Sequence, residues 1–188
     1  MSKSVLVLFA NGAEEIETVS IVDVLRRAEV KVVLASIQTS PDDNKTFVIC
    51  SRGVNIVPDC DAASANDCFD AVVLPGGMPN AQTLAKSEVV QKILKKHDDS
   101  GKLVAAICAA PIVLKAHGIK AGSISTCYPA LKGSIEDHFT FVDEKVVQDG
   151  NLITSQGPAT AMEFALKLIE FLMGEEKRNA IAKDLLFN

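Results

Sequence analysis

The feature that most constrains this chain is an alternation between short apolar runs and longer amphipathic stretches. Runs that are apolar on both faces are typical of strands in a parallel sheet, and the stretches between them have the spacing of covering helices. The apolar runs predict strands over residues 4–10, 31–36, 69–74, 102–107, 123–128 and 152–155. The stretches between them predict helices over residues 14–28, 87–100, 109–117, 160–173 and 175–185.

The remaining segments fit the same plan. Residues 46–49 and 54–57 predict a short hairpin, and the polar segment 38–45 predicts a loop. No internal repeat, low-complexity tract or long linker divides the 188 residues. We therefore predict an α/β fold of the flavodoxin-like, doubly wound type, with a mostly parallel sheet and helices on both faces. It forms a single domain over residues 1–188.

Charge and cysteine usage exclude several classes of function. The formal net charge is -5 and the Lys and Arg residues are dispersed, which argues against nucleic acid or an anionic membrane as a partner. No apolar run reaches the length of a membrane span or a signal-peptide core, so we expect a cytoplasmic protein. The five cysteines form no CxxC pair, so we expect neither a disulfide framework nor a metal site.

Cys108 is the strongest candidate for chemistry. It ends one apolar run and begins a helical stretch with no loop between, which is the geometry of a nucleophile elbow at the carboxyl end of a strand. A nearby helix N-terminus favours the thiolate form. The alternative is that Cys108 is a small buried side chain of a core strand.

Glu17 is the second candidate. On a helical projection it shares the apolar stripe of Ile21, Val24 and Leu25, whereas Glu15 points away from that stripe. A buried carboxyl has a raised pKa and can donate a hydrogen bond to a thiolate. The alternative is a partly exposed glutamate that interacts with the helix dipole.

Gly76 and Gly77 follow Pro75 at the end of another predicted strand. Their N–H groups could form an oxyanion hole, although an ordinary strand-ending turn is the alternative. No phosphate-binding GxxxxGK[ST] motif is present, and Gly12 alone does not make a GxGxxG fingerprint, so no cofactor is expected.

Three further side chains are weaker candidates. Tyr128 follows a predicted strand and could face the elbow, or be a half-buried aromatic residue. Arg52 and Glu14 could bind an anion or lie at a subunit interface. The alternative for Arg52 is a residue that caps a turn.

Five segments in order along the chain resemble the ThiJ/PfpI superfamily and, within it, the DJ-one branch of parkinsonism-associated deglycases. The matching segments are residues 12–17, 50–52, 73–77, 105–111 and 153–158. The resemblance implies a flavodoxin-like homodimer in which Cys108 is the oxidisable nucleophile and Glu17 is its protonated acid partner. It also implies that the N–H groups of Gly76, Gly77 and Ala109 surround the reacting oxygen or a cysteine sulfinate.

This sequence departs from the family pattern at several positions. Tyr128 replaces a histidine that often lies beside the nucleophile, so Glu17 would handle most of the proton transfer. Ala109 replaces the histidine of the protease-like branch, which argues against peptidase activity. Val57 stands where some relatives have an interface cysteine, and Gln156 where some have arginine.

Two functions are consistent with the resemblance. The first is a cysteine-dependent, glutathione-independent glyoxalase and protein deglycase that acts on methylglyoxal, glyoxal and their early protein adducts, with a role in oxidative stress. The second is a non-enzymatic redox sensor and redox-dependent chaperone that works through oxidation of Cys108.

Overall fold

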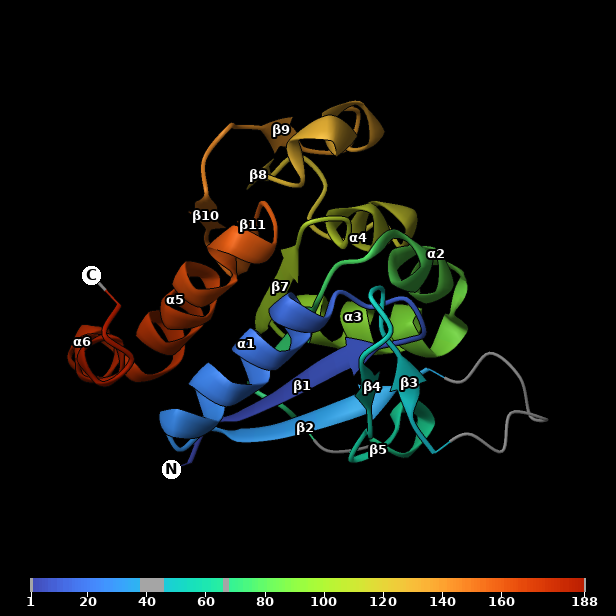
Figure 1. Ribbon diagram of the computed structural model, residues 1–188. Helices are drawn as coiled ribbons and strands as arrows, with labels where there is room; N and C mark the ends of the chain where they lie inside the picture. Colours follow the sequence, from blue (N-terminus) through green and yellow to red (C-terminus); the bar gives the residue numbers. More distant parts are fainter. Residues whose placement is uncertain (1, 38–45, 66–67, 188) are drawn as a thin grey trace.

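The computed structural model describes residues 2–37, 46–65 and 68–187. The predicted loop over residues 38–45 lies outside the described residues. The described chain forms a central seven-stranded sheet with helices packed on both of its faces (Figure 1). This is the predicted α/β architecture.

The central sheet has the strand order β10-β11-β7-β6-β1-β2-β5. The pairs from β11 to β5 are parallel, and β10 runs antiparallel to β11 at one edge. The order β2-β1-β6-β7-β11 is that of flavodoxin-like folds, in which the chain reverses direction across the sheet beside the first strand. The reversal lies between β1 and β6, so a ligand site is expected at the carboxyl ends of these strands. The strands are β1 Ser4–Phe9, β2 Lys31–Ser36, β5 Cys60–Asp61, β6 Ala71–Leu74, β7 Leu103–Ile107, β10 Val146–Asp149 and β11 Leu152–Ser155.

Strand β1 shows why the sheet needs a helical layer on each side. Its side chains alternate between two buried clusters: Val5, Val7 and Phe9 join one, and Leu6 and Leu8 join the other. The first cluster lies under α1 Glu15–Arg27, α5 Ala161–Met173 and α6 Glu175–Asp184, and the second under α2 Met78–Lys86, α3 Glu88–Asp99 and α4 Pro111–Ala116. Burial of both faces explains the continuous apolar runs in the sequence.

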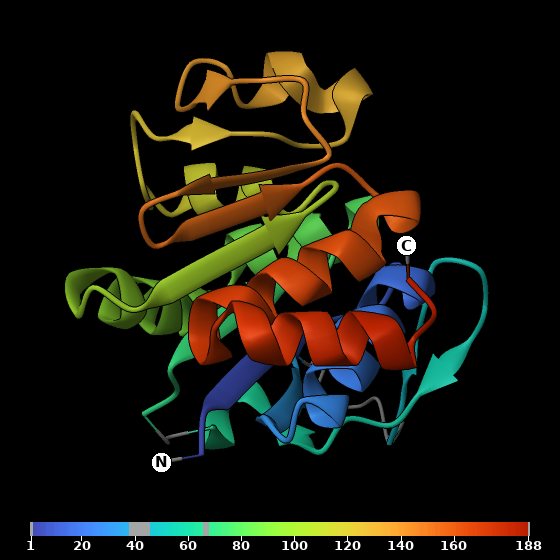
Figure 2. The same ribbon diagram turned by 90° about the vertical axis from the view of Figure 1, so that its left-hand side faces the viewer.

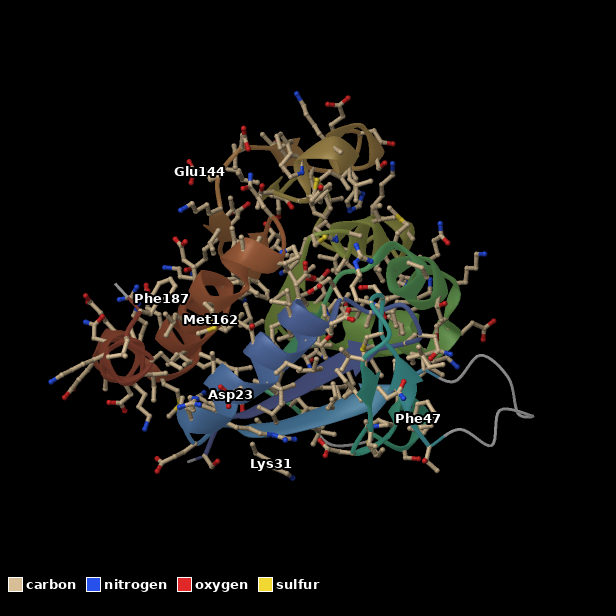
Figure 3. The ribbon with its side chains drawn as sticks, in the orientation of Figure 1. Asp23, Lys31, Phe47, Glu144, Met162 and Phe187 are labelled. Carbon is tan, nitrogen blue, oxygen red and sulfur yellow. The ribbon has the colours of Figure 1, made fainter. Side chains whose placement is uncertain are left out.

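The C-terminal helix α6 and the residues after it pack against the first buried cluster. Helix α6 lies along α5 (Figure 2). Met162 on α5 and Phe187 after α6 lie on the same side of the molecule, and both pack against this cluster (Figure 3). Within the described residues, no helix combines the length and apolar character needed to cross a membrane.

Several predicted elements differ from the observed ones. Residues 123–128 form a strand only at β8 Ile124–Ser125, which pairs with β9 Thr140–Phe141 outside the central sheet. The predicted helix over residues 109–117 begins at Pro111, because the chain first makes a turn after Cys108. The predicted hairpin is present as β3 Val48–Ile49 paired antiparallel with β4 Asn55–Ile56. The described ranges also contain three short 3-10 helices, at Ala62–Ser64, Pro129–Ser134 and Pro158–Thr160.

Helix α2 was not predicted. The predicted helices include none between residues 77 and 87, but α2 begins directly after Gly77 with Pro79 in its first turn. A proline is tolerated there because the first N–H groups of a helix have no partner within it. This short helix carries Asn80, which organises the glycine turn described below.

Candidate active site

Cys108 occupies a strained turn between β7 and α4. Its φ angle is 63°, a left-handed conformation that residues with a side chain rarely adopt. Its N–H donates to the Ser155 carbonyl at 2.9 Å, and its carbonyl accepts from the Tyr128 N–H at 2.9 Å. These bonds on both sides hold the turn, so the partly buried Cys108 side chain lies beyond the strand end, as at an elbow.

Glu17 lies in the first turn of α1 with its side chain fully buried. Its Oε2 atom accepts the Gly76 N–H at 2.7 Å, and its own N–H donates to the carboxylate of Glu14 at 2.8 Å. Its Oε1 atom has no hydrogen-bond partner among the described residues. Burial raises the pKa of Glu17 to about 7, against the opposing effect of the Gly76 hydrogen bond. Glu17 therefore holds its proton over much of the range in which an ordinary glutamate is ionised.

The thiol of Cys108 and the carboxyl of Glu17 lie on either side of Gly76, and each changes the pKa of the other. Burial and the charge of an ionised Glu17 raise the pKa of Cys108 to about 12, while the N–H groups of Gly77 and Ala109 act in the opposite direction. Two negative charges are therefore strongly disfavoured in this space, and the pair shares one charge and one proton. When Glu17 holds the proton, its O–H can donate to the sulfur, and the repulsion is replaced by a hydrogen bond.

The glycine turn after β6 is packed between these two side chains. A Cβ on Gly76 would lie 2.6 Å from Cβ of Cys108 and 2.7 Å from Oε2 of Glu17. Gly77 has φ 89°, and a Cβ there would lie 2.1 Å from the Gly12 carbonyl oxygen. Both positions therefore require glycine. The Gly76 N–H is bonded to Glu17, and the Gly77 N–H is directed at the sulfur.

Asn80 was not identified from the sequence, although it fixes this turn. Its fully buried side chain accepts the Ala10 N–H at 2.7 Å and donates to the carbonyls of Pro75 and Gly76 at 2.8 and 3.1 Å. The side chain thereby ties the end of β1 to the turn after β6. An asparagine beside prolines and glycines is common in turns and loops, so Asn80 gave no distinct signal.

A cavity of about 540 Å³ opens in front of Cys108. It brings together Cys108, Gly77, Ala109 and the three weaker candidates, while Glu17 and Gly76 are not among the lining residues. Tyr128 is 47% exposed and lies at the same cavity as Cys108. The lining residues are Glu14, Ser51, Arg52, Gly77, Met78, Pro79, Cys108, Ala109, Tyr128, Ala130, Leu131 and Pro158.

Glu15 points away from the apolar stripe of α1, as predicted, but it is buried by another segment. Its side chain is 8% exposed and accepts hydrogen bonds from the Ser51 hydroxyl and the Arg52 N–H, both at 2.7 Å. The turn between β3 and β4 folds over the start of α1 and covers this position. A helical projection could not detect the contact because the covering residues lie 36 and 37 positions further along the chain.

The cysteines form no disulfide bonds, since all five are free thiols. Within the described ranges, no group of three or more His, Cys, Asp or Glu side chains is placed to hold a metal ion. The chemistry that the described site offers is therefore that of a thiol, a carboxyl with a raised pKa and directed backbone N–H groups.

A doubly wound α/β sheet with a cysteine at a strained strand-to-helix elbow and a buried glutamate beside it defines a class of cysteine-elbow proteins. Comparison with known sequences places the chain within that class: it matches the DJ-1/PfpI family over residues 3–171, and it belongs to this family. Protein dj-1beta of Drosophila melanogaster is 48% identical, over 99% of this chain and 98% of its own length. The glutathione-independent glyoxalase DJR-1.2 of Caenorhabditis elegans is 41% identical, over 97% of this chain and 96% of its own length.

The fold agrees with that assignment. The crystal structure of Drosophila melanogaster DJ-1beta superposes with a TM-score of 0.95 at 47% identity and covers 100% of both chains. The predicted flavodoxin-like α/β fold and the predicted family are thus confirmed.

Proposed function

We propose that this protein is a cysteine-dependent, glutathione-independent glyoxalase and protein deglycase, with methylglyoxal, glyoxal and their early protein adducts as substrates. The observation that carries the proposal is the contact between Cys108 at the elbow and the buried Glu17, whose pKa is raised to about 7. The name of the Caenorhabditis elegans relative, a glutathione-independent glyoxalase, supports the same activity.

In the first step the Cys108 thiol passes its proton to the Glu17 carboxylate, and its sulfur adds to the aldehyde carbon of methylglyoxal. A carbon–sulfur bond forms, the carbonyl π electrons move to oxygen, and protonation gives a hemithioacetal. The N–H groups of Gly77 and Ala109, which favour negative charge on the sulfur, would stabilise the charge on the new oxygen. Glu17 supplies the proton as an acid. No external thiol is needed, because the protein provides the sulfur.

In the second step Glu17 acts as a base and then as an acid. Its carboxylate removes the proton from the carbon bonded to sulfur, which gives an enediolate, and returns it to the neighbouring carbon. The hydroxyl proton of the hemithioacetal moves to the oxygen on that carbon, and the carbon bonded to sulfur becomes the carbonyl of a lactoyl thioester. A group with a pKa of about 7 is suited to both directions of transfer at neutral pH. Water then hydrolyses the thioester, and lactate and the free thiol are released.

Deglycation uses the same chemistry on a larger substrate. An early glyoxal adduct on a side chain still carries a carbonyl carbon that the Cys108 sulfur can attack. The open cavity in front of Cys108 has room for such an adduct. Arg52 and Glu14 lie on the wall of this cavity and would contact the polar part of such a substrate. Tyr128 lines the same cavity and would orient the substrate, since Glu17 supplies the acid and base.

The second candidate function is a redox sensor and redox-dependent chaperone. Two oxygen atoms added to the Cys108 sulfur by peroxide would give a sulfinate. A protonated Glu17 and the N–H groups of Gly77 and Ala109 are arranged to donate hydrogen bonds to that group. Peptide mapping after peroxide treatment tests it: sulfinate concentrated at Cys108 supports the sensor, and sulfinate spread evenly over all five cysteines contradicts it.

We further propose a homodimer in the cytoplasm, with no nucleic acid or membrane as partner. Apolar side chains are exposed on α1 and in and just after the β3–β4 hairpin: Ile16, Val19, Val54 and Val57 are 56, 52, 48 and 68% exposed. Val19 and Val57 line one groove. Val57 is also where some relatives carry an interface cysteine. Sedimentation of wild type and Val57→Glu tests the proposal: a dimer that becomes a monomer supports this surface, and a wild-type monomer contradicts it.

Lactate formation from methylglyoxal, measured without glutathione, tests the enzymatic function. Wild type should form lactate from methylglyoxal, whereas the Cys108→Ala and Glu17→Ala variants should form none. Full turnover in Cys108→Ala would overturn the proposal. Absence of turnover in wild type, together with a peroxide-sensitive Cys108, would make the sensor the primary function.

A further inference from the structure

A second sulfur site lies at the opposite end of the sheet from Cys108. Cys68 precedes β6 and Lys102 precedes β7, and these two strands are parallel neighbours in register from Ala71 and Leu103 onward. The register brings Cys68 and Lys102 side by side at the amino ends of the strands. Cys108 follows the other end of β7, which is roughly 17 Å away at about 3.3 Å per residue.

Lys102 is fixed against the Cys68 sulfur. Its Nζ atom donates to Sγ of Cys68 at 3.0 Å and also to the backbone carbonyl of Phe69. The carbonyl anchors the ammonium group, so its position does not depend on the thiol alone. An ammonium group carries three donors, and these two bonds leave one for a further acceptor. Cys68 itself is exposed, so a reagent in solution can reach it.

The charged groups around Cys68 favour its thiolate. The Lys102 hydrogen bond and charge lower the pKa of Cys68, with a smaller contribution from Lys96 on α3, while Asp70 acts in the opposite direction. The other four cysteines have pKa values raised by burial. Cys68 is therefore the thiol best suited to react with a bulky reagent in solution.

A buried polar atom without a hydrogen-bond partner lies near the same place. His97 on α3 is 4% exposed, and its Nε2 atom has no hydrogen-bond partner among the described residues. Burial lowers the pKa of His97, and the charges of Lys102 and Lys96 lower it further, so the ring is neutral beside the Phe69 carbonyl. A buried nitrogen without a partner gains free energy when a polar group binds next to it.

We propose that Cys68 and Lys102 form a thiolation site that takes up a small anionic thiol by exchange with its disulfide. The Cys68 thiolate attacks one sulfur of the disulfide, and a new sulfur–sulfur bond forms as the old one breaks. The electron pair leaves with the second half of the reagent as a thiolate. Cys68 is oxidised to a mixed disulfide, half of the reagent is reduced, and an added thiol reverses the reaction.

The positive charges define the chemical class of the reagent. The remaining donor of Lys102 and the charge of Lys96 attract carboxylate groups, so an anionic disulfide such as glutathione disulfide is favoured over a neutral one of the same reactivity. The partly buried Cys108 lies at the opposite end of the sheet, beside the cavity where the aldehydes would enter. The two sulfur atoms therefore have separate roles, and this inference stands independently of the proposed enzymatic function.

The test uses the full chain with glutathione disulfide at neutral pH, followed by peptide mapping over time. Wild type should gain one glutathione at Cys68, at least about tenfold faster than at any other cysteine. Lys102→Met should slow this reaction about tenfold, whereas Lys92→Met, which removes an exposed lysine from the same helix as Lys96, should not. Cys68→Ser should abolish the fast uptake and leave any methylglyoxal turnover unchanged.

A neutral reagent, the disulfide of mercaptoethanol, separates charge recognition from general reactivity. Wild type should prefer glutathione disulfide over it, and Lys102→Met should lose that preference. First labelling at Cys108 or equally at all cysteines would overturn the proposal, and mapping of wild type alone decides this even where a variant does not fold. Equal rates in wild type and Lys102→Met would overturn the role of the lysine.

Discussion

The backbone N–H of Gly76 donates to Oε2 of Glu17 at 2.7 Å, and the same glycine leaves no space for a side chain between Glu17 and Cys108. The turn after β6 therefore sets the position of the carboxyl relative to the sulfur. Asn80 holds that turn from α2, and the Ser155 and Tyr128 backbone bonds hold the elbow. The site is assembled from four strand ends, and its chemistry depends on how they are kept together.

Gly76→Ala should disrupt the pair without changing any ionisable group. The added methyl group would lie 2.6 Å from Cβ of Cys108, 2.7 Å from Oε2 of Glu17 and 3.0 Å from the Ile107 carbonyl oxygen. We expect the free energy of unfolding to fall by about 2 kcal/mol and lactate formation to be lost. Gly133→Ala is the matched control, because a Cβ at Gly133 meets no atom within 4 Å. Equal effects of the two substitutions would contradict this role of Gly76.

Asn80→Ala should destabilise the protein through lost hydrogen bonds. The change leaves the Ala10 N–H and the Pro75 carbonyl without their partners in a fully buried position. Buried groups left without partners cost about 1–3 kcal/mol each, so chemical denaturation should show a loss of about 3 kcal/mol or more. The exposed Asn179 on α6 is the control, and Asn179→Ala should change stability little. A similarly small loss in Asn80→Ala would show that the turn does not depend on this side chain.

The stability of the protein should carry a pH dependence that originates at Glu17. The pKa of Glu17 is raised from 4.5 to about 7 by burial, so the folded state binds the proton more tightly than the unfolded state. Its contribution to stability is fully present below about pH 4.5 and is lost as the pH rises through about 7.

Glu17→Gln removes this titration, so its stability relative to wild type should increase with pH. The increase between about pH 4.5 and about pH 8.5 should be on the order of 3 kcal/mol. Denaturation curves at both pH values measure it. The control is Glu88→Gln, which changes an exposed glutamate in the first turn of α3. A difference between wild type and Glu17→Gln that does not vary with pH would mean that Glu17 is ionised throughout.

The parts of the fold that were predicted correctly are those with a local pattern. The apolar runs at β2 and β11 gave the observed bounds, because a strand buried on both faces shows a continuous run that ends where burial ends. Cys108 could be placed at an elbow because the apolar run and the helical stretch meet there. Glu17 could be identified because a carboxylate on an apolar stripe is uncommon.

The parts that were missed depend on contacts between distant segments. Helix α2 lies directly after two glycines, and its buried Asn80 shows no pattern without the β1 end that it contacts. Glu15 is covered by a hairpin turn far along the chain. The segment before Tyr128 contains β-branched residues that suit a strand, but the central sheet already pairs β7 with β11, so β8 pairs outside it.

The most direct test of the central claim is lactate formation by Glu17→Gln, with iodoacetamide labelling of Cys108 mapped in the same samples. The account predicts that Cys108 is still alkylated, because the amide keeps the shape of the site, while lactate formation falls by about 10²-fold or more because the amide cannot move a proton between carbons. Glu17→Asp should restore part of the rate. Lactate formation within about tenfold of wild type in Glu17→Gln would contradict the pairing of Cys108 with Glu17 as the catalytic unit.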